Sequence, residues 1–203
     1  MKLDIPEGRF AAYLFDCDGT IANSLPLHLK AWNSALAPWG TAFPEDDFYA
    51  WGGIPVPRTV EMLNEKLGLA MDIAQVTNAR EKAYHGLIDA VQSHAEVEAI
   101  IRKMYGKIPM AVVSGSPRAS VEKTLRQLAL WQFFEVIVGA EDVKMGKPQP
   151  EPFLTAARLI GVDPSTCLVF EDAEPGVQAA IAAGMKYVRI PQRRDSFGPF
   201  VSV

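Results

Sequence analysis

The sequence alternates between short apolar runs of strand length and segments whose apolar residues recur at helical spacing. The apolar runs lie near residues 10–16, 109–114, 134–138, 167–171 and 185–190, and the helical patterns lie near 96–105, 116–128, 152–160 and 175–183. Strands that alternate with helices are typical of a parallel sheet. At 203 residues, 49% of them hydrophobic, the chain can bury one good core with a small appendage.

This alternation breaks between about residues 24 and 90, where no comparable apolar strand occurs. Apolar residues share helix faces there, first Leu25, Leu29, Trp32 and Leu36, and then Val60, Leu63 and Leu67. Prolines and glycines divide the segment into short pieces. The sequence therefore predicts an α/β fold, in which a Rossmann-like parallel sheet core (1–23 and 91–203) carries an inserted small helical cap domain (24–90).

Two carboxylates follow the first apolar run directly, in Asp16-Cys17-Asp18-Gly19-Thr20. The alternation of side chains allows Asp16 and Asp18 to face one small volume at the carboxyl edge of the sheet. Carboxylates this close repel each other and lose hydration unless a cation neutralises them or one of them holds a proton. The run therefore indicates metal and phosphate chemistry, with an ordinary Asp-Gly turn as the alternative.

A hydroxyl group ends the second apolar run, where Ser114-Gly115-Ser116-Pro117 follows the strand. We expect Ser116 to cap the next helix and Pro117 to be its first residue. Ser114 and the Gly115 amide would then lie beside a helix N-terminus, which binds anions readily. An ordinary loop between a strand and a helix is the other interpretation.

Two further polar groups fall at or near strand ends. Lys147 lies in a stretch stiffened by three prolines, so its ammonium group needs little ordering to meet an anion, whereas we expect Lys144 to be a solvated charge. Glu171 and Asp172 end the fourth apolar run, and alone they could be a charge pair at a helix N-terminus. Because ligands bind at the carboxyl ends of strands in open α/β sheets, we expect all these groups to converge.

In this order, the chain resembles the haloacid dehalogenase-like phosphohydrolases over essentially its whole length. The motifs that carry the resemblance are Asp16-x-Asp18-Gly19-Thr20, Ser114, Lys147-Pro148 and Glu171-Asp172. The cap between the first two motifs is similar to that of the β-phosphoglucomutase-like branch, whose members include bacterial phosphatases acting on fructose 1-phosphate or 6-phosphogluconate. Asn23 replaces the usual aspartate, which leaves the hydrogen bonding of the hinge open. Gly52 stands where the mutases have a lysine, which favours a phosphatase.

The resemblance implies a mechanism with two aspartates. Asp16 would attack the phosphorus and form an aspartyl-phosphate, while Asp18 would protonate the departing oxygen and later activate water. Closure of the cap would exclude water and raise the pKa of Asp18. The cofactor would be Mg²⁺, held by the Asp16 carboxylate, the Asp18 backbone carbonyl and Asp172, with Glu171 binding it directly or through water. The groups expected to surround the phosphate are Ser114, the Gly115 amide and Lys147, and Thr20 would fix the Asp18 loop.

Residues of the cap are expected to meet the rest of the substrate. The resemblance implies that His28 helps to position Asp18, while a partly buried histidine with a local hydrogen bond is the alternative. Trp51-Gly52-Gly53 and Arg58 form the expected substrate loop, because glycine lets a backbone approach a ligand and arginine can bind a phosphate or carboxylate through two hydrogen bonds. Arg58 could instead be a surface cation.

Composition excludes several other functions. A net charge of −4 gives no basic field for nucleic acid, and no apolar stretch approaches the ~18–20 residues of a transmembrane helix. The N-terminus lacks the apolar segment of a signal peptide, so we expect a cytoplasmic protein. We expect a monomer or weak dimer whose partner is a small-molecule phosphomonoester.

Cys17 and Cys167 are expected to be buried free thiols. Arg193-Arg194 is expected to be a solvated turn.

Three alternatives to a phosphatase remain at this point. A phosphomutase would interconvert phosphate positions without releasing phosphate. A haloacid dehalogenase needs no metal and lacks the second aspartate, so the presence of Asp18 counts against it. A phospho-ligand binding protein without turnover would release no phosphate at all.

Overall fold

Five parallel strands form a single sheet in the order β3-β2-β1-β4-β5. The computed structural model describes residues 3–192, and the expected Arg193-Arg194 turn lies outside them. The strands are β1 (Ala12–Phe15), β2 (Met110–Val113), β3 (Val136–Val138), β4 (Cys167–Glu171) and β5 (Lys186–Arg189). Each lies inside the apolar run that predicts it. The predicted fold class is confirmed.

Helices cover both faces of the sheet. They are α5 (Ala95–Met104) and α6 (Arg118–Gln127) on one face, and α7 (Glu151–Ile160) and α8 (Glu174–Ala182) on the other. The alternation along β1 explains the two layers, because Phe15 and Cys17 pack with α5 and α6 while Leu14 packs with α7 and α8. Both cysteines are buried free thiols, as predicted.

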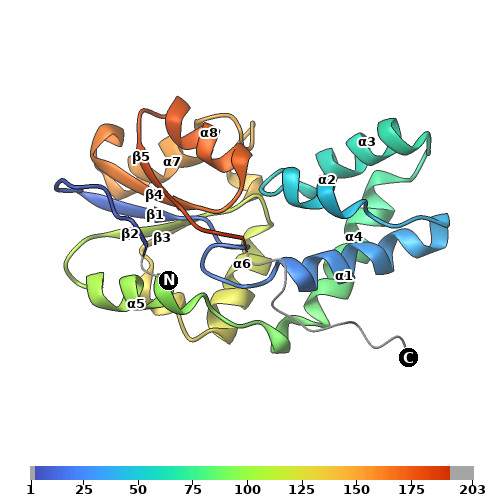
Figure 1. Cartoon of the computed structure of the whole chain (residues 1–203), viewed down its shortest axis with the longest axis horizontal. Helices are drawn as coiled ribbons and strands as arrows, with labels where there is room; N and C mark the ends of the chain where they lie inside the picture. The colour runs from blue at the N-terminus through green and yellow to red at the C-terminus, as the bar shows by residue number, and fades with distance from the viewer. Residues whose placement is uncertain (1–2, 193–203) are drawn as a thin grey trace.

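Four helices between β1 and α5 form the cap, which stands beside the sheet as a separate group (Figure 1). They are α1 (Leu25–Leu36), α2 (Glu45–Ala50), α3 (Val56–Leu67) and α4 (Ile73–His85). The cap has an apolar core of its own, to which α1 contributes Trp32 and Leu36, and α3 contributes Val60 and Leu63. None of the helices in residues 3–192 is long and apolar enough to cross a membrane.

The start of α6 differs from the prediction. Ser116 does not cap this helix: Pro117, in an extended conformation with φ −55° and ψ 141°, is the N-cap, and Arg118 is the first helical residue. The hydroxyl of Ser116 instead donates a hydrogen bond to Asp18 Oδ2 at 2.8 Å. The hydrogen bond to Asp18 therefore takes the place of the helix-capping bond that the sequence pattern predicts for Ser116.

Candidate active site

The register of the sheet brings the predicted site residues to one edge. Phe15 of β1 pairs with Val112 of β2 and with Phe170 of β4. The next residue, Asp16, continues this pairing, since its backbone N–H donates to the Phe170 carbonyl at 2.9 Å. Asp16 and Glu171 therefore leave neighbouring strands at the same level, one residue beyond the phenylalanine pair.

Lys147 lies in a loop and bridges residues at the ends of neighbouring strands. Its Nζ donates to Asp16 Oδ1 at 2.7 Å, to Glu171 Oε1 at 2.6 Å and to the Val113 carbonyl at 3.0 Å. Burial alone would lower the pKa of Lys147, but the two carboxylates raise it above its ordinary value, so the ammonium group stays charged. Asp16 Oδ2 is also buried, yet none of the described residues gives it a hydrogen-bond partner. One oxygen of Asp16 is held and the other is free.

Three buried carboxyl groups meet at this edge. Oxygens of Asp16, Glu171 and Asp172 lie within 4.8 Å of one another. Burial and the charges of its neighbours, Glu171 above all, raise the pKa of Asp16 well above its ordinary value, although Lys147 opposes the shift. Burial and the charge of Glu171 raise the pKa of Asp172 to about 7. Crowded oxygen ligands with excess negative charge suit a hard divalent cation such as Mg²⁺.

The loop after β1 is fastened to this carboxyl cluster. Thr20 Oγ1 donates to Asp172 Oδ1 at 3.1 Å, so Thr20 ties the Asp18 loop to the end of β4. Gly19 has φ +93°, and a Cβ there would overlap the Asp172 carboxylate. Glycine is therefore required at this position both for its backbone conformation and for the approach of Asp172.

Asp18 is surrounded by hydrogen-bond donors. Its Oδ1 accepts from Ser24 Oγ at 2.8 Å and lies 2.7 Å from His28 Nε2, and its Oδ2 accepts from Ser116. Burial favours a raised pKa, but His28, Ser24 and Ser116 together bring the pKa of Asp18 below its ordinary value. The predicted rise of this pKa is therefore wrong for the arrangement in the structure, because the donors stabilise the carboxylate more than burial destabilises it.

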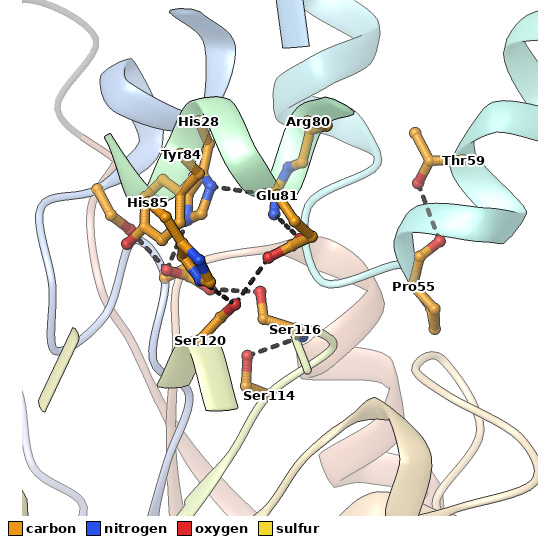
Figure 2. A network of polar contacts seen from close by, with 12 residues as sticks. His28, Pro55, Thr59, Arg80, Glu81, Tyr84, His85, Ser114, Ser116 and Ser120 are labelled. Atoms are coloured by element: carbon orange, nitrogen blue, oxygen red, sulfur yellow. Dashed lines mark hydrogen bonds and ion pairs between the residues drawn. The ribbon is translucent and has the colours of Figure 1, made fainter. Parts of the chain in front are cut away.

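Arg80 is a buried site residue that the sequence analysis missed. Its Nη2 lies 2.5 Å from His28 Nδ1, and its guanidinium group also pairs with Glu81 (Figure 2). Because an arginine only donates, His28 Nδ1 accepts and His28 Nε2 carries the hydrogen that faces Asp18. Burial, aided by the charge of Arg80, lowers the pKa of His28 although Asp18 opposes the shift, so the ring is neutral.

The contacts of Arg80 continue from the cap into the core. Glu81 on α4 accepts a hydrogen bond at 2.7 Å from Ser120 Oγ on α6, and His85 Nε2 lies 3.0 Å from the same hydroxyl (Figure 2). On the next turn, the Tyr84 hydroxyl lies 3.0 Å from Thr124 Oγ1. These contacts fasten the end of the cap to the helix that follows the Ser114 loop.

A cavity of about 580 Å³, including its opening to solvent, lies between cap and core. The core lines it with Asp16, Asp18, Ser114, Gly115 and Ser116. Trp51, Gly52 and Gly53 line it from the cap as expected. Arg58 does not: its side chain is 55% exposed, and Nη1 pairs with Glu61 at 2.8 Å. The structure brings the core residues and the glycine loop together and leaves Arg58 outside.

Glycines allow the cap loop to touch the core loops closely. A Cβ on Gly115 would overlap the Gly53 carbonyl, and one on Gly52 would come within 2.9 Å of Ala173 Cβ. A side chain at either position would separate the cap from the core. The closed arrangement of the cavity therefore depends on small residues on both sides.

The parallel sheet, the helical cap and the carboxylate-rich cavity between them define a class of capped α/β hydrolases. Residues 13–190 match the haloacid dehalogenase-like hydrolases. The chain is 37% identical over 183 residues to the fructose-1-phosphate phosphatase YqaB of Escherichia coli (strain K12), across 90% of this chain and 97% of that protein. The chain belongs to the haloacid dehalogenase-like hydrolase family, and it is a phosphatase.

A further relative agrees with this assignment, and a solved structure shares the fold. The chain is 31% identical over 186 residues to a validoxylamine A 7'-phosphate phosphatase of Streptomyces hygroscopicus subsp. limoneus, across 90% of this chain and 86% of that protein. A solved β-phosphoglucomutase from Clostridium difficile shares the fold, with a TM-score of 0.79 and 24% identity, over 88% of this chain and 83% of the other.

Proposed function

We propose that this phosphatase is Mg²⁺-dependent and hydrolyses a small sugar phosphate through an aspartyl-phosphate on Asp16. The observation that carries the proposal is the difference between the surroundings of the two oxygens of the Asp16 carboxylate. Lys147 holds Oδ1, while Oδ2 is buried without a partner among the described residues, at a cavity also lined by Ser114 and Gly115. An oriented carboxylate oxygen that forms no hydrogen bond is available as a nucleophile.

In the first step, Asp16 Oδ2 attacks the phosphorus in line as the bond from phosphorus to the ester oxygen breaks. The departing oxygen takes a proton from Asp18. Asp18 is ionised in the structure, so it takes up this proton as the substrate binds, because the phosphate charge beside it disfavours a second negative charge. In the second step Asp18 accepts a proton from water, which attacks the phosphorus and frees Asp16.

The remaining groups bind the phosphoryl oxygens and hold the carboxylates. The proposed phosphate ligands are Ser114 and the Gly115 amide, which line the cavity, and Lys147, which donates to the neighbouring Asp16. Asp16, Asp172 and the Asp18 backbone carbonyl would hold Mg²⁺. Glu171 accepts hydrogen bonds from Lys147 and from the Ala173 N–H at 2.8 Å, and it would bind the metal directly or through water. When bound, the metal would neutralise charge on the phosphoryl group.

The cap, proposed to span residues 24–90, would exclude water from these steps. Its His28 would keep Asp18 aimed at the departing oxygen, since Arg80 fixes the tautomer and direction of the ring. The sugar phosphate assignment draws on the fructose-1-phosphate phosphatase relative, and we propose a cytoplasmic enzyme whose only required partner is its substrate.

Phosphate release from a panel of sugar phosphates, measured with Mg²⁺ and with excess EDTA, tests the proposal. We expect release that depends on Mg²⁺ and disappears in Asp16→Asn. Conversion of one sugar phosphate into another without free phosphate would identify a mutase instead. Equal release with EDTA would refute the metal dependence, and activity in Asp16→Asn would refute the covalent intermediate.

A further inference from the structure

Most of the residues that line the cap half of the cavity are apolar. Its lining includes Trp32, Phe43, Phe48, Trp51, Ile54 and Val56. A charged group enclosed by such side chains loses its hydration without a partner to replace it, and this costs free energy. The aromatic and aliphatic walls instead suit the carbon-bound faces of a sugar or polyol. The part of the substrate beyond its phosphate therefore enters surroundings that disfavour charge.

One cationic side chain of the cap lines this part of the cavity, and its charge is compensated by a neighbouring glutamate. Arg80 is the one lysine or arginine among the described residues that line the cavity. Its side chain is 5% exposed, and its charge is paired with Glu81, which is 16% exposed. Nη2 is bonded to His28. Arg80 Nε is buried with no hydrogen-bond partner in the described chain, so the guanidinium group keeps one N–H that is not engaged by the protein.

Other cations of the cap lie elsewhere. Arg58 pairs with Glu61 on the surface, and Lys66 pairs with Asp47 at 2.6 Å, both outside the lining. Gly52, at the position where the related mutases have a lysine, cannot carry a side chain in this arrangement, because its Cβ would come within 2.9 Å of Ala173 Cβ. No described residue therefore supplies an uncompensated positive charge to the cap side of the cavity.

We infer that the enzyme selects phosphomonoesters whose leaving group is a neutral polyol or sugar and rejects those that carry a second anionic group. The inference rests on the proposed sugar phosphatase function and narrows the range of substrates expected for it. Arg80 and Glu81 set this selectivity as a pair: the arginine offers a hydrogen-bond donor, and the glutamate cancels its attraction for a second phosphate or a carboxylate. Bisphosphates and phosphorylated sugar acids are excluded for the same reason.

A matched pair of substrates tests this selectivity. Glucitol 6-phosphate and 6-phosphogluconate differ only at C1, where the first has a CH₂OH group and the second a carboxylate. We expect the wild-type enzyme to have a kcat/KM at least about tenfold higher for glucitol 6-phosphate. Equal values, or a preference for 6-phosphogluconate, would overturn the inference while leaving the phosphatase function intact. Failure to release phosphate from either ester or from 4-nitrophenyl phosphate would instead refute the proposed function.

Two variants test the origin of the selectivity. Glu81→Gln leaves the charge of Arg80 uncompensated, and Thr59→Lys adds a cation to the cavity lining, so each should reduce the preference for the neutral ester by about tenfold. Glu65→Gln is the control, because it removes the same charge from a cap side chain that is 71% exposed, and it should leave the ratio unchanged. A ratio that does not move in Glu81→Gln, or that moves equally in Glu65→Gln, would overturn the assignment to Arg80 and Glu81, and a ratio that does not move in Thr59→Lys would overturn the selectivity by charge.

Discussion

Replacement of Lys147 by alanine should lower both the stability of the protein and its activity. The Lys147 side chain is 1% exposed, and its ammonium group donates to Asp16, Glu171 and a backbone carbonyl. Removing one partner of a buried ion pair costs about 3–5 kcal/mol, because the other charge is left without compensation. For a chain of this size, about 2–4 °C of Tm corresponds to each kcal/mol, so Tm without metal should fall by roughly 6–20 °C. Phosphate release should fall by ~10²–10³-fold.

Addition of Mg²⁺ gives the sharper test of Lys147→Ala. Without the ammonium group, the three carboxyl groups carry one more uncompensated negative charge, so a divalent cation should stabilise the variant more than it stabilises the wild type. Thermal unfolding with and without Mg²⁺ measures both shifts. Lys144→Ala is the control, since this lysine lies on the same loop with an exposed side chain and should change neither Tm nor activity. A Mg²⁺-induced rise in Tm that is no larger than in the wild type would refute the charge-balance reasoning.

Three other substitutions address the reaction and the cap. Asp16→Asn should reduce turnover by at least ~10⁴-fold, about 5.5 kcal/mol in the barrier, in a steady-state assay of phosphate release with the fold checked by cooperative thermal unfolding; a residual tenth of the activity would contradict a covalent role. Asp18→Asn should spare the first step for an aryl phosphate, whose leaving group needs little protonation, so a burst of phenol followed by accumulation of phosphorylated enzyme is expected in rapid-quench experiments; equal loss of the first step for aryl and alkyl esters would argue against an acid at this position. Arg58→Ala should change kcat/KM by less than about twofold on sugar and aryl phosphates alike, because an exposed ion pair contributes little; a selective loss on sugar phosphates would return Arg58 to the substrate loop.

The sheet and the core of the site could be predicted because their positions follow from simple periodicities. Apolar runs mark the strands, and parallel strands bring the residues after them to one edge, so the meeting of Asp16 with Glu171 and Lys147 follows from topology. The sequence predicts a contact of Lys147 with phosphate, and the structure shows in addition that Lys147 pairs with two carboxylates. The sequence gives no means of deciding how a converging set of opposite charges shares its hydrogen bonds.

The cap was harder to predict, because its function depends on which face of each helix points inward. Arg58 is close to the glycine loop in sequence, but the buried side of α3 carries Val56, Thr59 and Val60, which turns Arg58 toward solvent. Arg80 had a detectable signal: it lies four residues from Val76 and four from Tyr84, both buried, on the same stripe of α4. A cation in an apolar stripe is an indication of a buried polar site that the sequence analysis did not use.

Correct folding and catalytic competence are linked through the pairing of Phe15 with Phe170. Side chains alternate along a strand, so a slip of one residue between β1 and β4 would turn Asp16 toward the opposite helical layer. The same slip would place Leu14 in the layer that Phe15 occupies in the native sheet. A misregistered sheet could therefore keep its secondary structure and lose all turnover. The specific activity of a refolded sample then measures the fraction of molecules in which β1 and β4 pair in the native register. Circular dichroism cannot distinguish these molecules from misregistered ones.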